Sequence, residues 1–210
     1  MDSFFRYGDC NMKLIIVRHG ETVENVVGIT QGHLNSRLSE KGVHQAKLVS
    51  QRLKNAPIDL AFSSDLCRAT DTCTEIMKFH PAAQMITTPL LREQSKGVFE
   101  GKTFTEAKSR YSNLPAFHLW HPEGGERLVD VWEKVIPFFE DIKREYADKT
   151  VLIVSHGGPI SCLLAYLHKK SIESYHEFLP EMNTAVSVVV IEGNNASFEL
   201  INCSAHFQSG

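Results

Sequence analysis

The chain has 210 residues, of which 42% are hydrophobic and 22% are charged, and its formal net charge at pH 7 is −3. This length suits one domain, or one domain with an insertion, and the apolar fraction is sufficient for a hydrophobic core. A mildly acidic balance argues against a nucleic-acid-binding protein or an anionic-membrane binder, and no apolar run is long enough to cross a membrane.

Apolar and amphipathic segments alternate along the first half of the chain, in a pattern that predicts strands and helices in turn. The predicted strands lie at 13–17, 59–62 and 84–88, and the predicted helices lie at 39–54, 65–79 and 103–111. Ser39 can cap the first of these helices, and helical spacing places Val43 on its buried face.

The second half continues the same alternation after a loop at 112–125, which is rich in proline and glycine. The clearest helix follows, with an apolar stripe of Leu128, Trp132, Val135, Phe139, Ile142 and Tyr146. A strand at 150–154, a helix at 159–168 and a hairpin of 185–192 with 196–203 complete the pattern.

This order of elements predicts an α/β fold, a three-layer α/β/α sandwich with a mostly parallel central sheet. The runs 13–17 and 150–154 are continuously apolar, as is typical of central parallel strands. The C-terminal hairpin is expected to form an antiparallel edge. We expect a flexible extension at 1–11 and a single domain at 12–210, with a cap or insertion at about 92–126.

The cysteines favour a reducing compartment. They are Cys10, Cys67, Cys73, Cys162 and Cys203. An odd, scattered set without a C-x-x-C pair predicts neither a disulfide framework nor a zinc site. The first residues also lack the long apolar stretch of a signal peptide, so we expect a cytoplasmic protein.

Three apolar runs end abruptly in polar residues. The first runs into Arg18 and His19, the second is followed shortly by Arg68, and the third ends at Ser155 and His156. Ligands of open parallel sheets bind beyond the carboxyl ends of the strands, so these side chains should meet in space. Guanidinium groups, histidines and the backbone N–H of Gly157 at a helix N-terminus suit a phosphate group.

With these residues in view, the sequence resembles the histidine phosphatase superfamily of phosphoglycerate mutase-like proteins. The motifs that carry the resemblance are L-I-I-V-R-H-G-E-T at 14–22, Q-G at 31–32, L-S-E-K-G at 38–42, S-S-D-L-x-R-A at 63–69, L-R-E at 91–93, P-E-G-G-E at 122–126 and S-H-G-G at 155–158. They occur in the order and spacing of the family and extend over roughly residues 13–190. The acid phosphatase branch is disfavoured, because Gly157 rather than an acid follows His156.

The resemblance implies a mechanism for this chain. His19 would attack phosphorus and carry the phosphoryl group. Arg18, Arg68 and His156 would bind the phosphoryl oxygens. Glu93 would protonate the leaving oxygen and later activate water. The resemblance further places Asn25, Gln31, Gly32 and Gly157 around the phosphate.

The likeness to individual branches favours a phosphatase. A cofactor-dependent mutase would carry a longer, basic insertion after Glu93, whereas the segment here is short and resembles the fructose-2,6-bisphosphatase and broad-specificity phosphatase group. Mutase activity is the first alternative, and a weakly active protein-binding member of the family is the second.

We expect a small phosphorylated metabolite, such as a sugar phosphate or a phosphoglycerate-like compound, to be the substrate, with no metal and no cofactor. Lys102, His118 and Trp120 lie in the expected cap and are candidates for contact with the substrate, with Lys102 facing a second phosphate or a carboxylate. Phe99 and Phe117 could form walls of the pocket. The sequence is compatible with a homodimer.

Overall fold

The computed structural model of the chain describes residues 11–111 and 116–207. The expected extension at 1–11 lies outside these ranges except for Asn11, which is the first residue of a strand. Of the predicted loop at 112–125, the structure describes residues 116–125. Within the described ranges, no helix is long and apolar enough to span a membrane.

The described strands form one sheet with the order β3-β2-β4-β1-β5-β6. Their bounds are β1 Asn11–Arg18, β2 Leu60–Ser64, β3 Gln84–Thr88, β4 Thr150–Ser155, β5 Val186–Glu192 and β6 Asn195–Cys203. The first four strands pair in parallel, whereas β5 pairs antiparallel with β1 and β6 pairs antiparallel with β5. The predicted mostly parallel sheet with an antiparallel edge is therefore confirmed.

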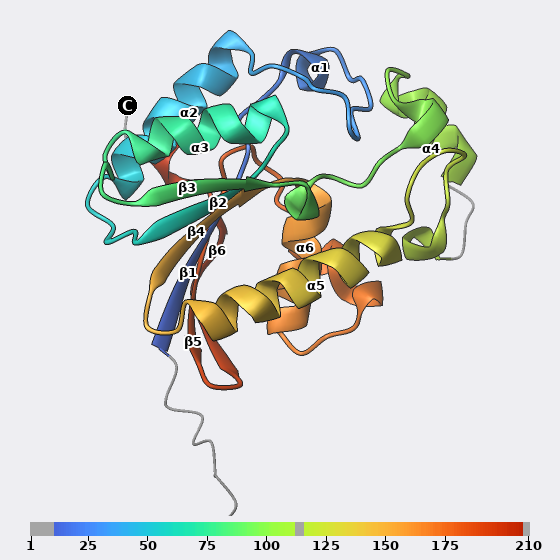
Figure 1. Cartoon of the computed structure of the whole chain (residues 1–210). Helices are drawn as coiled ribbons and strands as arrows, with labels where there is room; N and C mark the ends of the chain where they lie inside the picture. The colour runs from blue at the N-terminus through green and yellow to red at the C-terminus, as the bar shows by residue number, and fades with distance from the viewer. Residues whose placement is uncertain (1–10, 112–115, 208–210) are drawn as a thin grey trace, which may run out of the picture.

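Helices cover both faces of this sheet, as the prediction of three layers requires (Figure 1). Their bounds are α1 Val23–Val26, α2 Glu40–Leu53, α3 Cys67–Met77, α4 Phe104–Tyr111, α5 Leu128–Glu145 and α6 Gly157–Leu167. The pair α2 and α3 packs on one face, and the pair α5 and α6 packs on the other. Short 3₁₀ turns lie at Pro89–Leu91, Gly97–Phe99, Phe117–Leu119, Ile172–Phe178 and Ala205–Phe207.

An apolar core lies between the sheet and the helices on each of its faces, so β1 and β4 are buried on both sides. Alternate residues of each strand face opposite helix pairs, so that Leu14 and Ile16 join the core under α5 and α6, while Ile15 and Val17 join the core under α2 and α3. Each of the four side chains is at most 2% exposed. Burial of one such side chain contributes about 1.5–3 kcal/mol, so the continuously apolar runs account for the central position of these strands.

One residue of the predicted helical stripes is misplaced. Val43 is 43% exposed, while Ala46, Val49 and Leu53 are buried as expected. At the start of α2 the interior position is taken by Gly42, where an added Cβ would lie 1.9 Å from the carbonyl oxygen of Glu21. This close backbone contact rotates Val43 outward, and no periodicity of apolar residues can indicate it.

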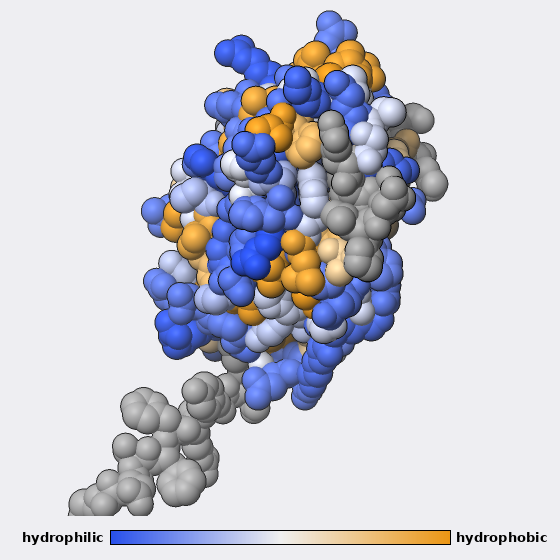
Figure 2. Space-filling model, turned by 90° about the vertical axis from the view of Figure 1, so that its right-hand side faces the viewer, coloured by the Kyte–Doolittle hydropathy of each residue, from blue (hydrophilic) through white to orange (hydrophobic). Residues whose placement is uncertain are grey.

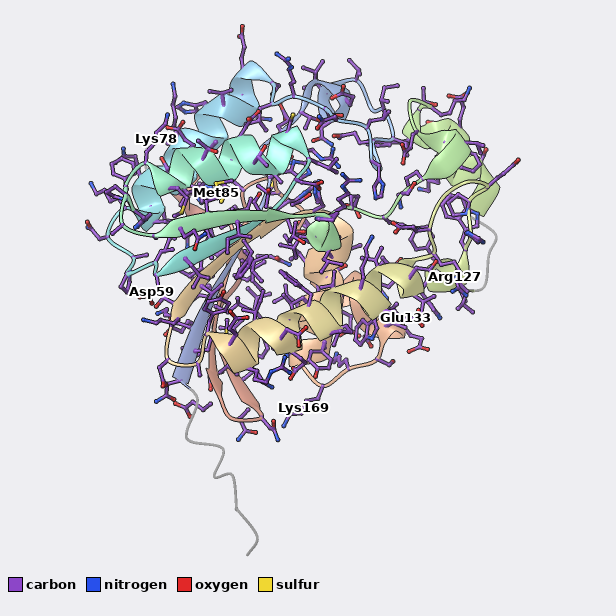
Figure 3. The ribbon with its side chains drawn as sticks, viewed as in Figure 1. Asp59, Lys78, Met85, Arg127, Glu133 and Lys169 are labelled. Carbon is purple, nitrogen blue, oxygen red and sulfur yellow. The ribbon has the colours of Figure 1, made fainter. Side chains whose placement is uncertain are left out.

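The carboxyl ends of β1, β2 and β4 lie together and face the segment that contains α4. In register, Arg18 is opposite Ser155, and Ser63 is opposite Val154. Arg127, directly before α5, lies at this same end of the molecule (Figure 3). The arrangement brings the three motif-bearing strand ends to one edge, which is where the sequence predicts the site.

Candidate active site

A cavity of about 690 Å³ opens at this edge of the sheet. It is lined by Arg18, His19, Asn25, Thr30, Gln31, Gly32, Arg68, Glu93, Gln94, Lys96, Phe104, Ala107, Phe117, Trp120, Leu128, Gly157, Gly158, Tyr175, Leu179 and Pro180. Figure 2 views the molecule from this side, where apolar and polar groups are interspersed. Most residues that the sequence singled out therefore converge on one cavity, although they are distant along the chain.

His19 follows the last residue of β1 and is only 4% exposed. Its Nδ1 lies 2.7 Å from the carbonyl oxygen of Gly20. Because a carbonyl can only accept, Nδ1 carries the proton and Nε2 keeps its lone pair. Burial, followed by the charges of Arg68 and Arg18, holds the pKa of His19 well below its usual value. The imidazole is therefore neutral at pH 7, as a nucleophile requires.

A chain of hydrogen bonds holds the backbone carbonyl of His19. The amide of Asn183 donates to the carbonyl oxygen of His19 at 3.0 Å, and the backbone N–H of Thr184 reaches the carbonyl oxygens of Arg18 and His19 at 3.1 and 3.3 Å. The hydroxyl of Thr184 in turn contacts His206. The backbone of His19 is thus anchored by residues from the C-terminal part of the chain.

His156 is completely buried behind the cavity, and its ring centroid lies 5.0 Å from that of His19. Its Nδ1 accepts a hydrogen bond of 3.1 Å from Nε of Arg68, so its proton resides on Nε2, 2.8 Å from the hydroxyl of Ser64. His156 therefore orients Arg68 in the described arrangement. To donate to a phosphoryl oxygen, as the family resemblance implies, Nε2 would have to leave Ser64.

Arg68 lies at the start of α3 and is 1% exposed. Its Nη1 and Nη2 donate to the carbonyl oxygens of Leu34 and Gly32 at 2.7 and 2.8 Å. Burial lowers its pKa to about 10, which leaves the guanidinium charged at pH 7. A guanidinium fixed in this way presents its remaining N–H groups to the cavity in a set orientation.

Arg18 is the second guanidinium of the cavity. Its Nη1 donates to the carbonyl oxygen of Pro180 at 2.9 Å, while its Nε is buried and has no hydrogen-bond partner among the described residues. An unsatisfied charged donor inside a protein is costly, so a bound anion would complete this site.

Glu93 faces the N-terminus of α6. One carboxylate oxygen accepts from the backbone N–H of Gln94 at 2.8 Å, and the other accepts from that of Gly158 at 3.3 Å. A Cβ at Gly158 would lie 2.4 Å from Glu93, so a glycine is needed for this approach. The positive end of the α6 dipole, at Gly157, thus lies beside both the acid and the cavity.

Asn25 belongs to a capping box at the start of α1. Its Oδ1 accepts from the backbone N–H of Thr22 at 3.1 Å, and its own N–H donates to the Thr22 hydroxyl at 3.1 Å. With Oδ1 engaged, the amide NH₂ is the part of the side chain available to a ligand in the cavity. The helix cap therefore fixes the orientation of the predicted phosphate donor.

Glu100 connects the segment of Gln31 and Gly32 to the segment of Lys96. Its Oε1 accepts from the backbone N–H groups of His33 and Lys96 at 2.9 and 3.0 Å. Gly32 has a φ of +51°, and an added Cβ would lie 2.7 Å from the backbone nitrogen of Lys96. The two segments are therefore in direct contact at the cavity wall, and Gly32 allows this contact.

The structure does not bring every predicted residue to the cavity. Trp120 lines the cavity, whereas Lys102 and His118 do not. The side chain of Lys102 is exposed, and its carbonyl oxygen accepts from the N–H of Thr30 at 2.8 Å. His118 instead lies 3.9 Å from the carboxylate of Glu173.

Several residues of the cavity were missed by the sequence analysis. Lys96, rather than Lys102, supplies the lysine of the cavity wall. Its position three residues after Glu93 could have indicated that it lies near the site. Tyr175 and Leu179 come from the 3₁₀ turn Ile172–Phe178 and the residues that follow it. Nothing in the local sequence relates that segment to the site.

Comparison with known proteins decides the family. Residues 14–204 match the model of the histidine phosphatase superfamily (branch 1). The chain belongs to this superfamily. Phosphoserine phosphatase 1 of Hydrogenobacter thermophilus is 31% identical over 202 residues, which cover 93% of this chain and 94% of that protein. The chain is therefore assigned to the phosphoric monoester hydrolases.

Other relatives show how widely the superfamily varies in activity. A 2,3-bisphosphoglycerate-dependent phosphoglycerate mutase of Brucella melitensis is 29% identical over 188 residues, covering 84% of this chain and 90% of that protein. The solved structure of a mycobacterial glucosyl-3-phosphoglycerate phosphatase with VO3 matches with a TM-score of 0.81 and 26% identity, over 91% of this chain and 99% of that chain. The phosphoglycerate mutase-like fold expected from the motifs is confirmed.

Proposed function

We propose that this histidine phosphatase hydrolyses small phosphorylated metabolites through a phosphohistidine on His19, without a metal ion. The observation that carries the proposal is the state of His19: Nδ1 is tied to the carbonyl of Gly20, and Nε2 is left as a neutral nucleophile in a cavity with two guanidinium groups. Arg18 and Arg68 supply the positive charge that stabilises the transferring phosphoryl group.

In the first step, Nε2 of His19 forms a bond to phosphorus while the bond from phosphorus to the ester oxygen breaks. The leaving oxygen takes a proton from the carboxyl of Glu93, which enters the step protonated. The imidazole ring gains a positive charge, and its Nδ1–H stays on the carbonyl of Gly20. Arg18 and Arg68 hold the phosphoryl oxygens, while His156 and Ser64 keep Arg68 in place.

In the second step, water replaces the imidazole. The Glu93 carboxylate takes a proton from the attacking water, the oxygen of this water bonds to phosphorus, and the bond from phosphorus to Nε2 breaks. Inorganic phosphate leaves, His19 returns to its neutral form, and Glu93 is again protonated for the next cycle.

The second candidate function is phosphoryl transfer between phosphoglycerates, which is favoured by the 29% identity to a mutase. The two functions differ in the fate of the phosphohistidine, which is passed to water in one and to a second substrate in the other. Without a bisphosphoglycerate primer, we expect steady release of inorganic phosphate and no conversion of 3-phosphoglycerate to 2-phosphoglycerate. A primer-dependent conversion that outpaces phosphate release would assign the mutase function instead.

A rapid-quench experiment with ³²P-labelled substrate tests the intermediate. The sample is quenched in base, because acid hydrolyses the bond from phosphorus to nitrogen in phosphohistidine. We expect label on the peptide that contains His19, no label and no turnover in His19→Ala, and unchanged labelling in the matched variant His44→Ala, since His44 is exposed on α2. Turnover by His19→Ala at the parent rate would refute the mechanism and favour a protein-binding role.

Three expectations from the sequence enter this proposal unchanged. We place the protein in the cytoplasm, treat the segment at about 92–126 as the cap of a single domain, and retain a homodimer as the assembly. Independence from metal is tested by adding EDTA during turnover, which we expect to leave the rate of phosphate release unchanged. Strong inhibition that is reversed by added divalent cation would overturn this part of the proposal.

A further inference from the structure

Lys96 is a cation of the cavity wall for which the described residues provide no counter-ion in direct contact. Its Nζ donates to Oε1 of Gln94 at 2.6 Å and lies 5.5 Å from the ring centre of Phe117. In the described ranges, no carboxylate lies within ion-pair distance of this ammonium group. An ammonium group has three N–H donors, so the contact with Gln94 leaves capacity for a further acceptor.

The nearby carboxylates are each engaged by other donors. Glu93 accepts from Gln94 and Gly158, Glu100 accepts from His33 and from the backbone of Lys96, and Glu126 pairs with Lys134 at 2.8 Å. Burial lowers the pKa of Lys96, while the charges of Glu93, Glu100 and Glu126 raise it. These carboxylates favour the ammonium form without neutralising it by direct contact.

Three aromatic rings form an extended wall beside this ammonium group. Phe117 stacks on Trp120 with a centroid distance of 5.9 Å and an interplanar angle of 29°, and on Tyr175 with 5.9 Å and 27°. All three rings line the cavity. Aromatic surface of this kind contributes through apolar burial and ring stacking with a planar ligand.

The size of the cavity points to a substrate larger than a phosphorylated three-carbon compound. Its volume of about 690 Å³ lies within the range, about 300–1,000 Å³, of sites that hold drug-sized ligands. Two further polar atoms of the lining, Oγ1 of Thr30 and Oε1 of Gln31, are buried without a hydrogen-bond partner among the described residues. They would be satisfied by a polar group on the body of a bound substrate.

We infer that the preferred substrate is an aromatic phosphomonoester that carries a carboxylate. Its phosphoryl group faces His19, its ring packs against the wall of Phe117, Trp120 and Tyr175, and its carboxylate pairs with Lys96. This inference rests on the proposed phosphatase function and specifies the substrate class of the same site. It assigns to Lys96 the anion recognition that the sequence analysis expected of Lys102.

The carboxylate is tested with two substrates that share one leaving group. O-phosphotyrosine and tyramine phosphate are both phenyl phosphates and differ only in the carboxylate. We expect the parent enzyme to favour O-phosphotyrosine in kcat/KM by roughly 10-fold or more, the range of one charge-assisted hydrogen bond. Lys96→Met should abolish this preference, whereas Lys102→Met, which removes an exposed lysine of the same segment, should keep it.

The aromatic wall is tested with 2-phenylethyl phosphate and ethyl phosphate, which both release an alkanol. We expect the parent to favour the phenyl compound in kcat/KM, and Trp120→Leu to reduce the ratio of the two kcat/KM values at least several-fold. Equal rates with the two alkyl phosphates in the parent, or an equal loss on both in Trp120→Leu, would overturn the role of the wall.

A binding measurement separates this inference from the catalytic proposal. The phosphonate analogue of O-phosphotyrosine, in which a methylene replaces the ester oxygen, cannot be hydrolysed, so its affinity is measured by calorimetry without turnover. We expect the parent to bind it roughly 10-fold more tightly than Lys96→Met does. Equal affinities of the parent and Lys96→Met would overturn the inference even if His19 is phosphorylated during turnover. If no phosphohistidine forms but the affinity still depends on Lys96, only the catalytic proposal is overturned.

Discussion

The imidazole of His206 and the hydroxyl of Thr184 lie 3.0 Å apart. Nη1 of Arg52 donates to Nδ1 of His206 at 3.1 Å, so the imidazole proton lies on Nε2 and is donated to Thr184. The Thr184 hydroxyl then donates to the carbonyl of Asn183, whose amide holds the carbonyl of His19. One directed chain of hydrogen bonds therefore leads from α2, through the C-terminal turn, to the backbone of His19.

We expect Thr184→Val to lower kcat by roughly 10-fold with little change in KM. Valine cannot accept from His206, and Thr184 has a φ of +55°, a conformation that costs a β-branched residue about 1–3 kcal/mol without these bonds. The rates of Thr184→Val and Thr184→Ser are compared by steady-state kinetics. Serine keeps the hydroxyl and should restore most of kcat; a serine variant as slow as the valine variant would contradict this positioning role.

Glu100→Ala should lower kcat/KM more than Glu100→Gln does. Alanine leaves the backbone N–H groups of His33 and Lys96 without their acceptor, which costs about 1–3 kcal/mol for a buried donor, whereas glutamine keeps an oxygen that can accept. The difference should appear mainly in KM, because Glu100 holds together two segments of the cavity wall. Equal effects of the two substitutions would argue that its charge, and not its hydrogen bonds, is what matters.

Arg92→Ala should reduce kcat while destabilising the fold only slightly. Arg92 holds Asp65 by two hydrogen bonds of 2.7 and 2.6 Å. Because Arg92 directly precedes Glu93 in the sequence, the loss of these bonds should disturb the position of the proposed general acid. Both side chains are about one-third exposed, and a pair of this kind contributes about 1 kcal/mol or less. Urea unfolding and kinetics on the same variant separate the two effects: a large stability loss without a kinetic effect would contradict this expectation.

The buried histidines should make the fold less stable in mild acid. Burial, followed by the charge of Arg52, lowers the pKa of His206 to about 4, whereas an unfolded chain binds that proton near pH 6.5. Between these values the unfolded state binds more protons than the folded state, so the free energy of unfolding falls as the pH falls from about 6.5 to about 4. His19 and His156, whose pKa values are also lowered, act in the same direction.

The urea midpoint measured at pH 7, 6 and 5 checks this dependence. His206→Gln should reduce the slope of the free energy of unfolding against pH by at most about 1.4 kcal/mol per pH unit, the contribution of one proton. A variant whose slope equals that of the parent would show that His206 is protonated equally in both states.

The sequence by itself determined the elements and the residues that we propose as the catalytic centre. Arg18, His19, Arg68 and His156 lie at or shortly after the carboxyl ends of strands that contain apolar runs, and parallel strands place their carboxyl ends at one edge whatever the details of packing. The convergence of these residues follows from local patterns together with one topological rule. Glu93 was likewise identified from its motif and Trp120 from its place in the expected cap, and both line the cavity.

Tertiary structure alone decided the surroundings of this centre. Lys96 and Lys102 have the same chemistry and lie six positions apart, and only the path of the segment held by Glu100 turns one into the cavity and leaves the other in solvent. The contacts of Asn183 and Thr184 with the backbone carbonyl of His19 join positions more than 160 residues apart. Such contacts depend on close packing and on hydrogen-bond geometry, and neither periodicity nor composition records them.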